Sequence, residues 1–291
     1  MPISKSAANS ARRAALTLLL TAVAALSCVA AWVLYVDPYS VWRTEPISSD
    51  MGALDRKMRF AKTLQIYVRP IKTAFVGSST MYRGINPGQL PPSLVAYNLG
   101  VSSLRATELL TFMRALARFG HPEDVVISLD YFMFDGNRQT EAGFDAAIDQ
   151  PLHAVELLLY SLVGKDAVAD TFMVWKGRHT VTEDGVWMGN GYKKTSDRPA
   201  KEVNRIRLNT RKEYAMMRYD AGLLTKIAEA ISVLRAGGAR VHLFLSPVHA
   251  DFYQLIGEVG QDADYRCFKA DVAALAQKSA VNLRDFSDFQ T

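Results

Sequence analysis

Residues 71–87 read IKTAFVGSSTMYRGINP, and this stretch decides the fold that we expect. Residues 73–76 are apolar and partly β-branched over the length of a short strand. Gly77 then interrupts the strand, and Ser78 and Ser79 follow at once. In open α/β sheets, ligands bind at the edge formed by the carboxyl ends of the strands. The stretch therefore predicts a strand that presents serine hydroxyls at a functional edge.

Such a position suits serine chemistry, because the hydroxyl is exposed and backbone N–H groups are free to hold an oxyanion. The alternative is a plain polar turn between a strand and a loop, since Gly and Ser are ordinary turn residues. The spacing by itself leaves both interpretations open.

The rest of the chain alternates apolar runs of strand length with amphipathic segments of helical period. Alternating strands and helices predict an α/β fold whose parallel sheet has helices on both faces. Residues 177–196 have no clear period, and we expect a hairpin or a long surface insertion there. The further strands are expected at 94–97, 125–129, 241–245 and 281–283, and the helices at 54–67, 107–119, 152–163, 222–234 and 270–278.

Polar residues follow three other predicted strands. Asn98-Leu99-Gly100 follows the second, Asp130 follows the third, and Ser246-Pro247-Val248-His249 follows the fourth. Because parallel strands end at one edge, these residues can converge on Ser79. Of the five histidines, His249 alone comes just after a strand, so it is our candidate general base. A capping or turn histidine beside a proline is the alternative.

The amino terminus predicts a membrane anchor. Residues 14–36 carry no charge over 23 positions, which is enough helix to cross a bilayer core of about 30 Å. Basic residues precede this run and Asp37 follows it, which predicts residues 1–13 in the cytoplasm. A cleaved signal peptide and a buried soluble helix are the alternatives. We expect residues 37–53 to form a linker and residues 54–291 to form the α/β domain outside the cytoplasm.

Composition limits the remaining classes of function. The chain has 49% hydrophobic and 22% charged residues, which is typical of a globular protein. Its net charge of +5 is spread without a dense basic patch, so we expect no nucleic-acid partner. Cys28 and Cys267 lie far apart, and no Cys/His spacing predicts a metal site.

With these motifs in order, the chain resembles the SGNH, or GDSL, hydrolase family. That family places its nucleophilic serine directly after the first strand, in a Gly-Asp-Ser element. Gly77-Ser78-Ser79 is similar to this element, with Ser79 at the nucleophile position and Ser78 in place of Asp. Asn98-Leu99-Gly100 is similar to the family's Asn-x-Gly turn. The resemblance implies a flavodoxin-like sheet.

The resemblance also implies an activity. Ser79 would form an acyl-serine, and the N–H groups of Gly100 and Ser79 would hold the oxyanion. Ser78, Asn98 and Asp130 would bind substrate, and no cofactor or metal would be required. The membrane-anchored envelope branch is the most similar, which includes D-alanyl transfer and alginate O-acetyltransferase proteins. It implies an envelope glycan or acyl donor as substrate, an integral-membrane acyl-transfer partner, and a single-pass protein of the inner membrane with a periplasmic domain.

Two elements of the family are missing from this sequence. The family's oxyanion Asn should follow the third strand, where this chain has Asp130-Tyr131-Phe132-Met133. The Asp-x-x-His element near the carboxyl terminus, which supplies the family's base, does not occur. We therefore expect either a carboxyl-terminally incomplete chain or one that has lost its base. A non-catalytic envelope protein that binds glycan or a membrane partner is the second hypothesis, and an unrelated α/β binding protein is the third.

Overall fold

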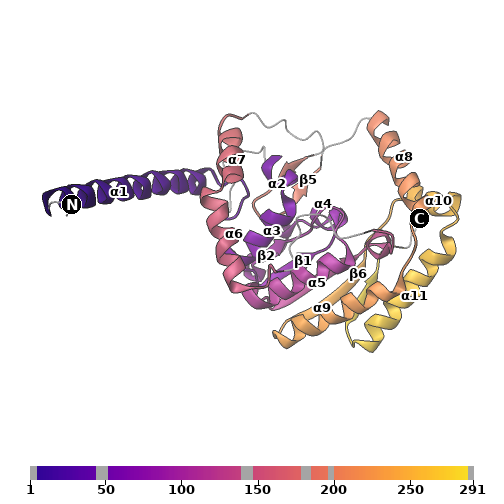
Figure 1. Ribbon diagram of the computed structural model, residues 1–291. Helices are drawn as coiled ribbons and strands as arrows, with labels where there is room; N and C mark the ends of the chain where they lie inside the picture. The colour runs from indigo at the N-terminus through magenta and orange to yellow at the C-terminus, as the bar shows by residue number, and fades with distance from the viewer. Residues whose placement is uncertain (1–4, 44–51, 139–146, 178–184, 196–199, 288–291) are drawn as a thin grey trace.

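The structure is a computed structural model that describes residues 5–43, 52–138, 147–177, 185–195 and 200–287. Five strands form one parallel sheet in the spatial order β2–β1–β3–β6–β7. The strands are β1 (Thr73–Val76), β2 (Ala96–Asn98), β3 (Asp124–Leu129), β6 (Arg240–Leu245) and β7 (Asn282–Asp285). The predicted α/β class is confirmed, with each strand found within two residues of its expected position (Figure 1).

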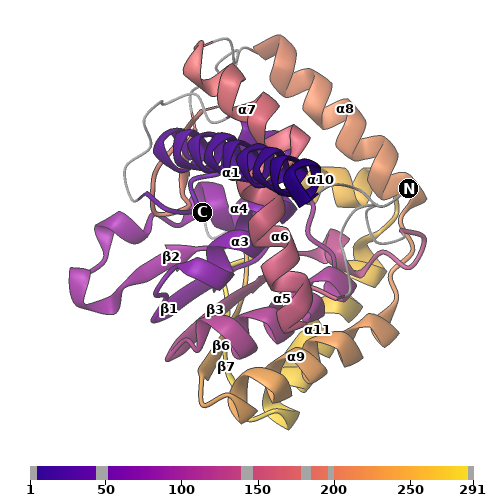
Figure 2. The ribbon, with the colours of Figure 1, turned by 60° about the vertical axis from the view of Figure 1, so that its left-hand side comes forward.

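Three helices lie along one face of this sheet. They are α5 (Ala106–Ala115), α9 (Leu224–Ala236) and α11 (Asp262–Lys278), and α9 packs against both of the others (Figure 2). The apolar side chains of the strands beneath them are fully buried, among them Ile127, Leu129, Leu243 and Leu245. Burial of these aliphatic side chains supplies the main driving force of the fold.

The opposite face of the sheet is less covered. Here the side chains of Phe75, Val126, His242 and Phe244 are only half-buried. The crossover from β1 to β2 contains only the short helix α4 (Ser79–Gly84) and the 3₁₀ turns η1 (Pro87–Gln89) and η2 (Pro92–Leu94). Helices thus flank the sheet unevenly, and β7 at its edge is largely exposed.

The remaining helices and strands precede the sheet or lie between its strands in the sequence. Helices α2 (Gly52–Arg56) and α3 (Met58–Val68) lie where one helix over 54–67 is expected, and α6 (Pro151–Val163) matches its prediction. Strands β4 (Val186–Trp187) and β5 (Lys193–Lys194) form the expected hairpin. The sequence did not predict α7 (Lys165–Trp175), α8 (Ala200–Met216) or α10 (Ala250–Glu258). Residues 178–184 and 196 of the predicted insertion lie outside the described residues.

Two helices depart from their predicted ends. The helix expected over 107–119 is α5 followed by η3 (Leu116–Gly120), a π-helical turn. The wider turn ends at His121, whose φ of 44° is left-handed. The helix expected to begin at residue 270 begins eight residues earlier, at Asp262. Acidic residues in its first turn, Asp262 and Asp264, stabilise that start by interaction with the helix dipole.

Helix α1 (Lys5–Val36) projects from the domain (Figure 1). Its segment Asn9–Val36 is the one helix of the described residues that is long and apolar enough to cross a membrane. The helix ends at Val36, where the sequence places Asp37 and Pro38 as a stop. Large apolar side chains along it are exposed, including Leu18, Leu20 and Leu26.

The chain leaves α1 through a tight turn rather than a loose segment. Residues 37–41 of the expected linker are buried against the α/β domain. The Asp37 carboxylate accepts hydrogen bonds of 2.8 Å from three backbone N–H groups, those of Val41, Trp42 and Arg43. From α3, the Gln65 side chain donates to the carbonyls of Tyr39 and Ser40, and Arg69 just after the helix also donates to the Ser40 carbonyl. These bonds fix the base of α1 to the domain.

Candidate functional site

Ser79 is the first residue of α4, and only Gly77 and Ser78 separate it from the end of β1. Ser78, the residue before it, caps the helix, because its hydroxyl accepts a hydrogen bond from the Thr80 N–H. Gly77 is required for this turn, since a Cβ there would lie 1.9 Å from the Ser128 hydroxyl of β3. Ser79 is partly exposed, and its side chain has no hydrogen-bond partner among the described residues. The predicted nucleophile thus stands at the carboxyl edge with an uncommitted hydroxyl.

Asp130, which follows β3, is the buried centre of a hydroxyl cluster. The Ser78 hydroxyl donates a short hydrogen bond to its carboxylate. The Thr80 hydroxyl donates to both carboxylate oxygens, at 2.9 and 3.2 Å. Ser246, which follows β6, contacts the Thr80 hydroxyl at 3.1 Å. The cluster therefore joins the ends of β1, β3 and β6.

Asp130 is a buried carboxyl without a cationic partner in the described part of the chain. Burial raises the pKa of the Asp130 carboxyl above its usual value, and the hydrogen bonds from Ser78, Ser246 and Thr80 partly oppose that rise. No salt bridge to Asp130 occurs among the described residues. A carboxyl in this setting can accept or release a proton closer to neutral pH than an exposed one.

The Asn98 turn holds α4 from the other side. The Asn98 amide donates to the carbonyls of Met81 and Ile85, at 2.9 and 2.8 Å. Its side-chain oxygen accepts from the Gly100 N–H at 2.9 Å. A Cβ at Gly100 would lie 2.8 Å from the Tyr82 backbone nitrogen, so only glycine fits against α4. The Gly100 N–H expected in an oxyanion hole is thus already bonded within this turn.

Lys62 of α3 also contacts the Asn98 turn. It is fully buried and donates to the carbonyls of Asn98 and Gly191, at 2.7 and 3.2 Å. Its ammonium lies about 5 Å from the ring centroids of Tyr97 and Trp187. Burial lowers the pKa of the Lys62 amine well below its usual value. Trp187 is itself buried and is part of the core.

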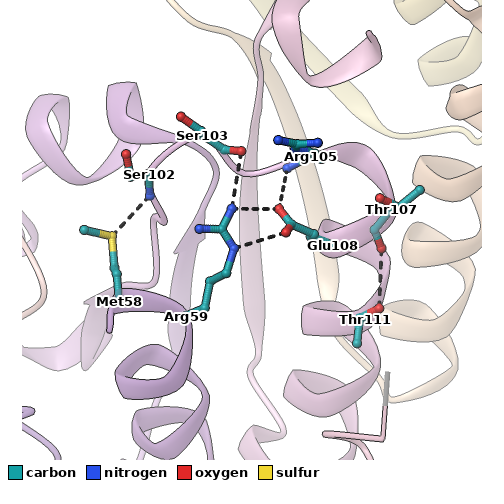
Figure 3. Close-up of polar contacts among 8 residues, drawn as sticks. All are labelled: Met58, Arg59, Ser102, Ser103, Arg105, Thr107, Glu108 and Thr111. Carbon is teal, nitrogen blue, oxygen red and sulfur yellow. Dashed lines mark hydrogen bonds and ion pairs between the residues drawn. The ribbon is translucent and has the colours of Figure 1, made fainter. Parts of the chain in front are cut away.

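The loop that follows Gly100 is braced by an ion pair. Arg59 of α3 donates two hydrogen bonds to the carboxylate of Glu108, which is fully buried in α5 (Figure 3). The Glu108 carboxylate also accepts from the Arg105 backbone N–H, and the Met58 sulfur accepts from the Ser102 N–H (Figure 3). A bidentate arginine–carboxylate pair has fixed geometry. This pair therefore fixes α5 relative to α3 on the Asn98 side of the site.

His249 lies at the same edge but does not contact Ser79 in this structure. It caps α10, where its Nδ1 accepts from the Asp251 N–H at 3.2 Å. Its side chain is 80% exposed. Its Nε2 has no hydrogen-bond partner among the described residues. The role of general base for His249 stays a prediction.

A cavity of about 270 Å³ opens beside the cluster. Its polar lining residues include Thr80, Asp130, Ser246 and His249. Its lining also includes aromatic rings from α8, α10 and α11: Tyr214, Phe252, Tyr265 and Phe268. A pocket lined by both polar groups and aromatic rings fits a ligand that presents both a polar group and a flat or apolar face. Ser79 itself is not among the lining residues.

Three residues of this site were not singled out from the sequence: Thr80, Ser246 and Lys62. Thr80 directly follows Ser79, and its β-hydroxyl is the only local signal for it. Ser246 was part of a motif after the fourth strand, although no role was assigned to it. Lys62 gave no signal, because a lysine at helical spacing usually faces solvent.

No group of three or more His, Cys, Asp or Glu side chains within the described ranges is placed to hold a metal ion. Comparisons of the chain with protein-family models, with curated proteins and with solved structures gave no match. Any function assigned to the chain therefore rests on the geometry of the residues at the carboxyl edge of the sheet.

Proposed function

We propose that the chain is a membrane-anchored SGNH-like serine esterase or O-acyltransferase that acts on cell-envelope glycans through an acyl-serine. One observation carries this proposal. Ser79 stands at the start of α4 with a free hydroxyl, while its neighbours Ser78 and Thr80 are bonded to Asp130. The rest of α4 is held by Asn98. A hydroxyl that is free between fixed neighbours has the preorganisation that nucleophilic catalysis needs.

The topology supports the SGNH-like part of the proposal. Numbered along the chain, the five strands of the sheet have the spatial order 2-1-3-4-5. This is the order of flavodoxin-like sheets, whose ligands bind where the strand order reverses, next to the first strand. Ser79 lies just after that strand, three positions beyond its last residue Val76.

In the proposed reaction, the Ser79 oxygen attacks an acyl carbonyl and its proton passes to the Nε2 of His249. The Ser79 N–H stabilises the oxyanion, and the Gly100 N–H adds a second donor once it leaves the Asn98 oxygen. The alcohol leaves with the proton from the imidazolium, which gives the acyl-serine. Attack of water on the acyl-serine would make the protein an esterase. Attack of a sugar hydroxyl would make it an acyltransferase. No cofactor is required for either outcome.

The anchor supports the cellular setting. Lys5, Arg12 and Arg13 precede the apolar segment, which favours a cytoplasmic amino terminus under the positive-inside rule. The α/β domain would then be periplasmic, on a single-pass protein of the inner membrane. In that position its acyl donor would come from an envelope component or from an integral-membrane acyl-transfer partner.

Active-serine labelling tests the proposal. The full-length chain in detergent is treated with a fluorophosphonate probe, beside Ser79→Ala, His249→Ala and the control Ser93→Ala. Ser93 is an exposed serine of η2, outside the site. We expect the wild type and Ser93→Ala to be labelled, Ser79→Ala to be silent, and His249→Ala to react at least about tenfold more slowly, as loss of a general base requires. Equal labelling of Ser79→Ala and wild type would refute the assignment.

A non-catalytic glycan-binding protein is the second candidate, and the aromatic cavity favours it. Tyr214 and Phe252 line that cavity with ring centroids 5.2 Å apart. Such rings can stack on the apolar face of a sugar. If no serine is labelled while soluble peptidoglycan fragments bind to the wild type and not to Phe252→Ala, the binding protein is the better description.

A further inference from the structure

Helix α6 carries an apolar stripe that the fold does not use. Leu152, Val155, Leu159 and Val163 recur at spacings of three and four residues, which places them on one side of the helix. All four are exposed, Leu152 by 87% and Leu159 by 58%. Glu156 is the only carboxylate on the helix, and it pairs with His153 at 3.4 Å. A stripe of this kind on a soluble surface marks an interaction site.

Helix α7 continues this apolar surface. Its last turns expose Phe172, Met173 and Trp175. The Lys176 ammonium lies 4.3 Å from the centroid of the Phe172 ring, so an aromatic and a basic group occur together. Aromatic rings beside basic side chains are typical of the boundary between lipid and water.

The surface is continuous with the base of α1. Both α6 and α7 pack against α1. The Tyr35 ring in the last turn of α1 lies 6.2 Å from the Trp175 ring, and Arg43 donates to the Tyr35 carbonyl at 3.1 Å. In Figures 1 and 2, α6 runs across the direction of α1. With α1 close to the bilayer normal, a helix that runs across it lies close to the bilayer plane.

We propose that α6 and α7 lie in the headgroup region of the bilayer that α1 crosses and form a second membrane contact. The occupant of the apolar surface is the lipid itself, because the surface begins where the membrane helix ends. Interfacial helices bury their apolar face about 5–10 Å into the boundary between headgroups and acyl chains. Leu152, Leu159 and Phe172 would reach that depth, and Lys176 and Arg43 would face the phosphates.

The experiment places an environment-sensitive fluorophore at single cysteines in the full-length chain. Cys28→Ala and Cys267→Ser remove the native thiols, and Leu159→Cys carries the label on the proposed surface. Leu208→Cys on α8 is the matched control, since Leu208 is equally exposed at 58% but has Arg207 beside it. Leu20→Cys in α1 reports membrane insertion. The variants are reconstituted in phosphatidylethanolamine–phosphatidylglycerol vesicles that contain lipid-borne quenchers at shallow or deep positions.

We expect the shallow quencher to lower emission at position 159 at least about twofold more than at position 208, because only the first contacts the interface. The deep quencher should act mainly at position 20. Equal behaviour of positions 159 and 208 would overturn the proposal. Protection of position 159 from both lipid-borne quenchers and aqueous iodide would overturn it in favour of a protein partner or a second copy. An unquenched label at position 20 would show that α1 is not inserted in the bilayer. The proposal requires that insertion and would be overturned.

Discussion

The two faces of the central sheet differ in how completely they are buried. On the face beneath α5, α9 and α11, the side chains of Ile127, Leu243 and Leu245 are excluded from water. On the other face, Val126, His242 and Phe244 of the same strands remain half-exposed. Neighbouring residues of one strand therefore experience different environments, since successive side chains point to opposite faces.

This difference shows which part of the sheet holds the fold together. Three helices close the first face as a continuous core, whereas the crossover that contains α4 covers the second face only partly. The edge that carries the candidate site is formed by the carboxyl ends of these strands, so its geometry depends mainly on the closed face. Substitutions on the two faces should consequently differ in their effect on stability.

The largest effect is expected for Leu243→Ala on the closed face. Leu243 is 1% exposed and lies between Ile127 and Leu283 in the register of the sheet. Its truncation should lower the free energy of unfolding by about 2–5 kcal/mol, because a cavity forms that the helices cannot fill. Urea unfolding of the full-length chain in detergent, followed by near-UV circular dichroism, measures this loss. A loss below that of Phe244→Ala would contradict the difference between the faces.

Phe244→Ala, one residue along on the open face, should have a smaller effect. Phe is larger than Leu, yet Phe244 is only half-buried and its ring contacts Phe286 at a centroid distance of 6.0 Å. We expect a loss of about 1–2 kcal/mol, since part of the side chain is already in water in the native state. The same unfolding measurement tests it, with Phe244→Leu as a control that should retain most of the stability. A loss as large as that of Leu243→Ala would mean that the open face is covered in solution.

Asp124→Asn should have the smallest effect and a distinct pH dependence. Hydrogen bonding to Arg240 holds the pKa of the Asp124 carboxyl below its usual value, so its contribution to stability is present above about pH 4 and is lost as the pH falls through the native pKa. Because the Arg240 side chain is 70% exposed, solvent screens its interaction with Asp124, and we expect a loss of less than about 1 kcal/mol at pH 7.

The pH series for Asp124→Asn compares unfolding of the variant and the wild type between pH 7 and about pH 2, because the native pKa of Asp124 lies below its usual value. The difference between the two curves should shrink at the acidic end, where the wild-type carboxyl takes up its proton. A difference that stays constant over the whole series would assign the effect to packing and not to charge.

Strand positions were predictable from the sequence because each strand carries its own signal. The run 125–129 is almost entirely apolar, and Gly77 marks the end of β1. Helix α8 was missed because it is polar over most of its length, with Arg207, Arg211 and Lys212 among its residues, and so shows no apolar period. The linker expected over 37–53 packs on the domain from residue 37 to residue 41, since Asp37 binds the turn that follows it.

The candidate site was predictable only in part. The turns at Ser79 and Gly100 have local motifs, and the parallel sheet brings them to one edge. The bond between Thr80 and Asp130 joins residues 50 positions apart, and no periodicity reports such a contact. Nothing in the sequence marks Lys62 as buried, because its burial depends on the carbonyls of Asn98 and Gly191, which come together only in the folded protein.

The turn at Asp37 limits how far the α/β domain can move relative to α1. Since Gln65 and Arg69 clamp this turn, the domain cannot swing on α1 as it would on a flexible stalk. If α1 spans a membrane as proposed, this turn would hold the sheet edge at one height above the bilayer. Under the proposed function, only acyl groups at that height would reach Ser79. Lengthening the turn by a few glycine and serine residues would give the domain a flexible linker and would widen the range of heights that the sheet edge can reach.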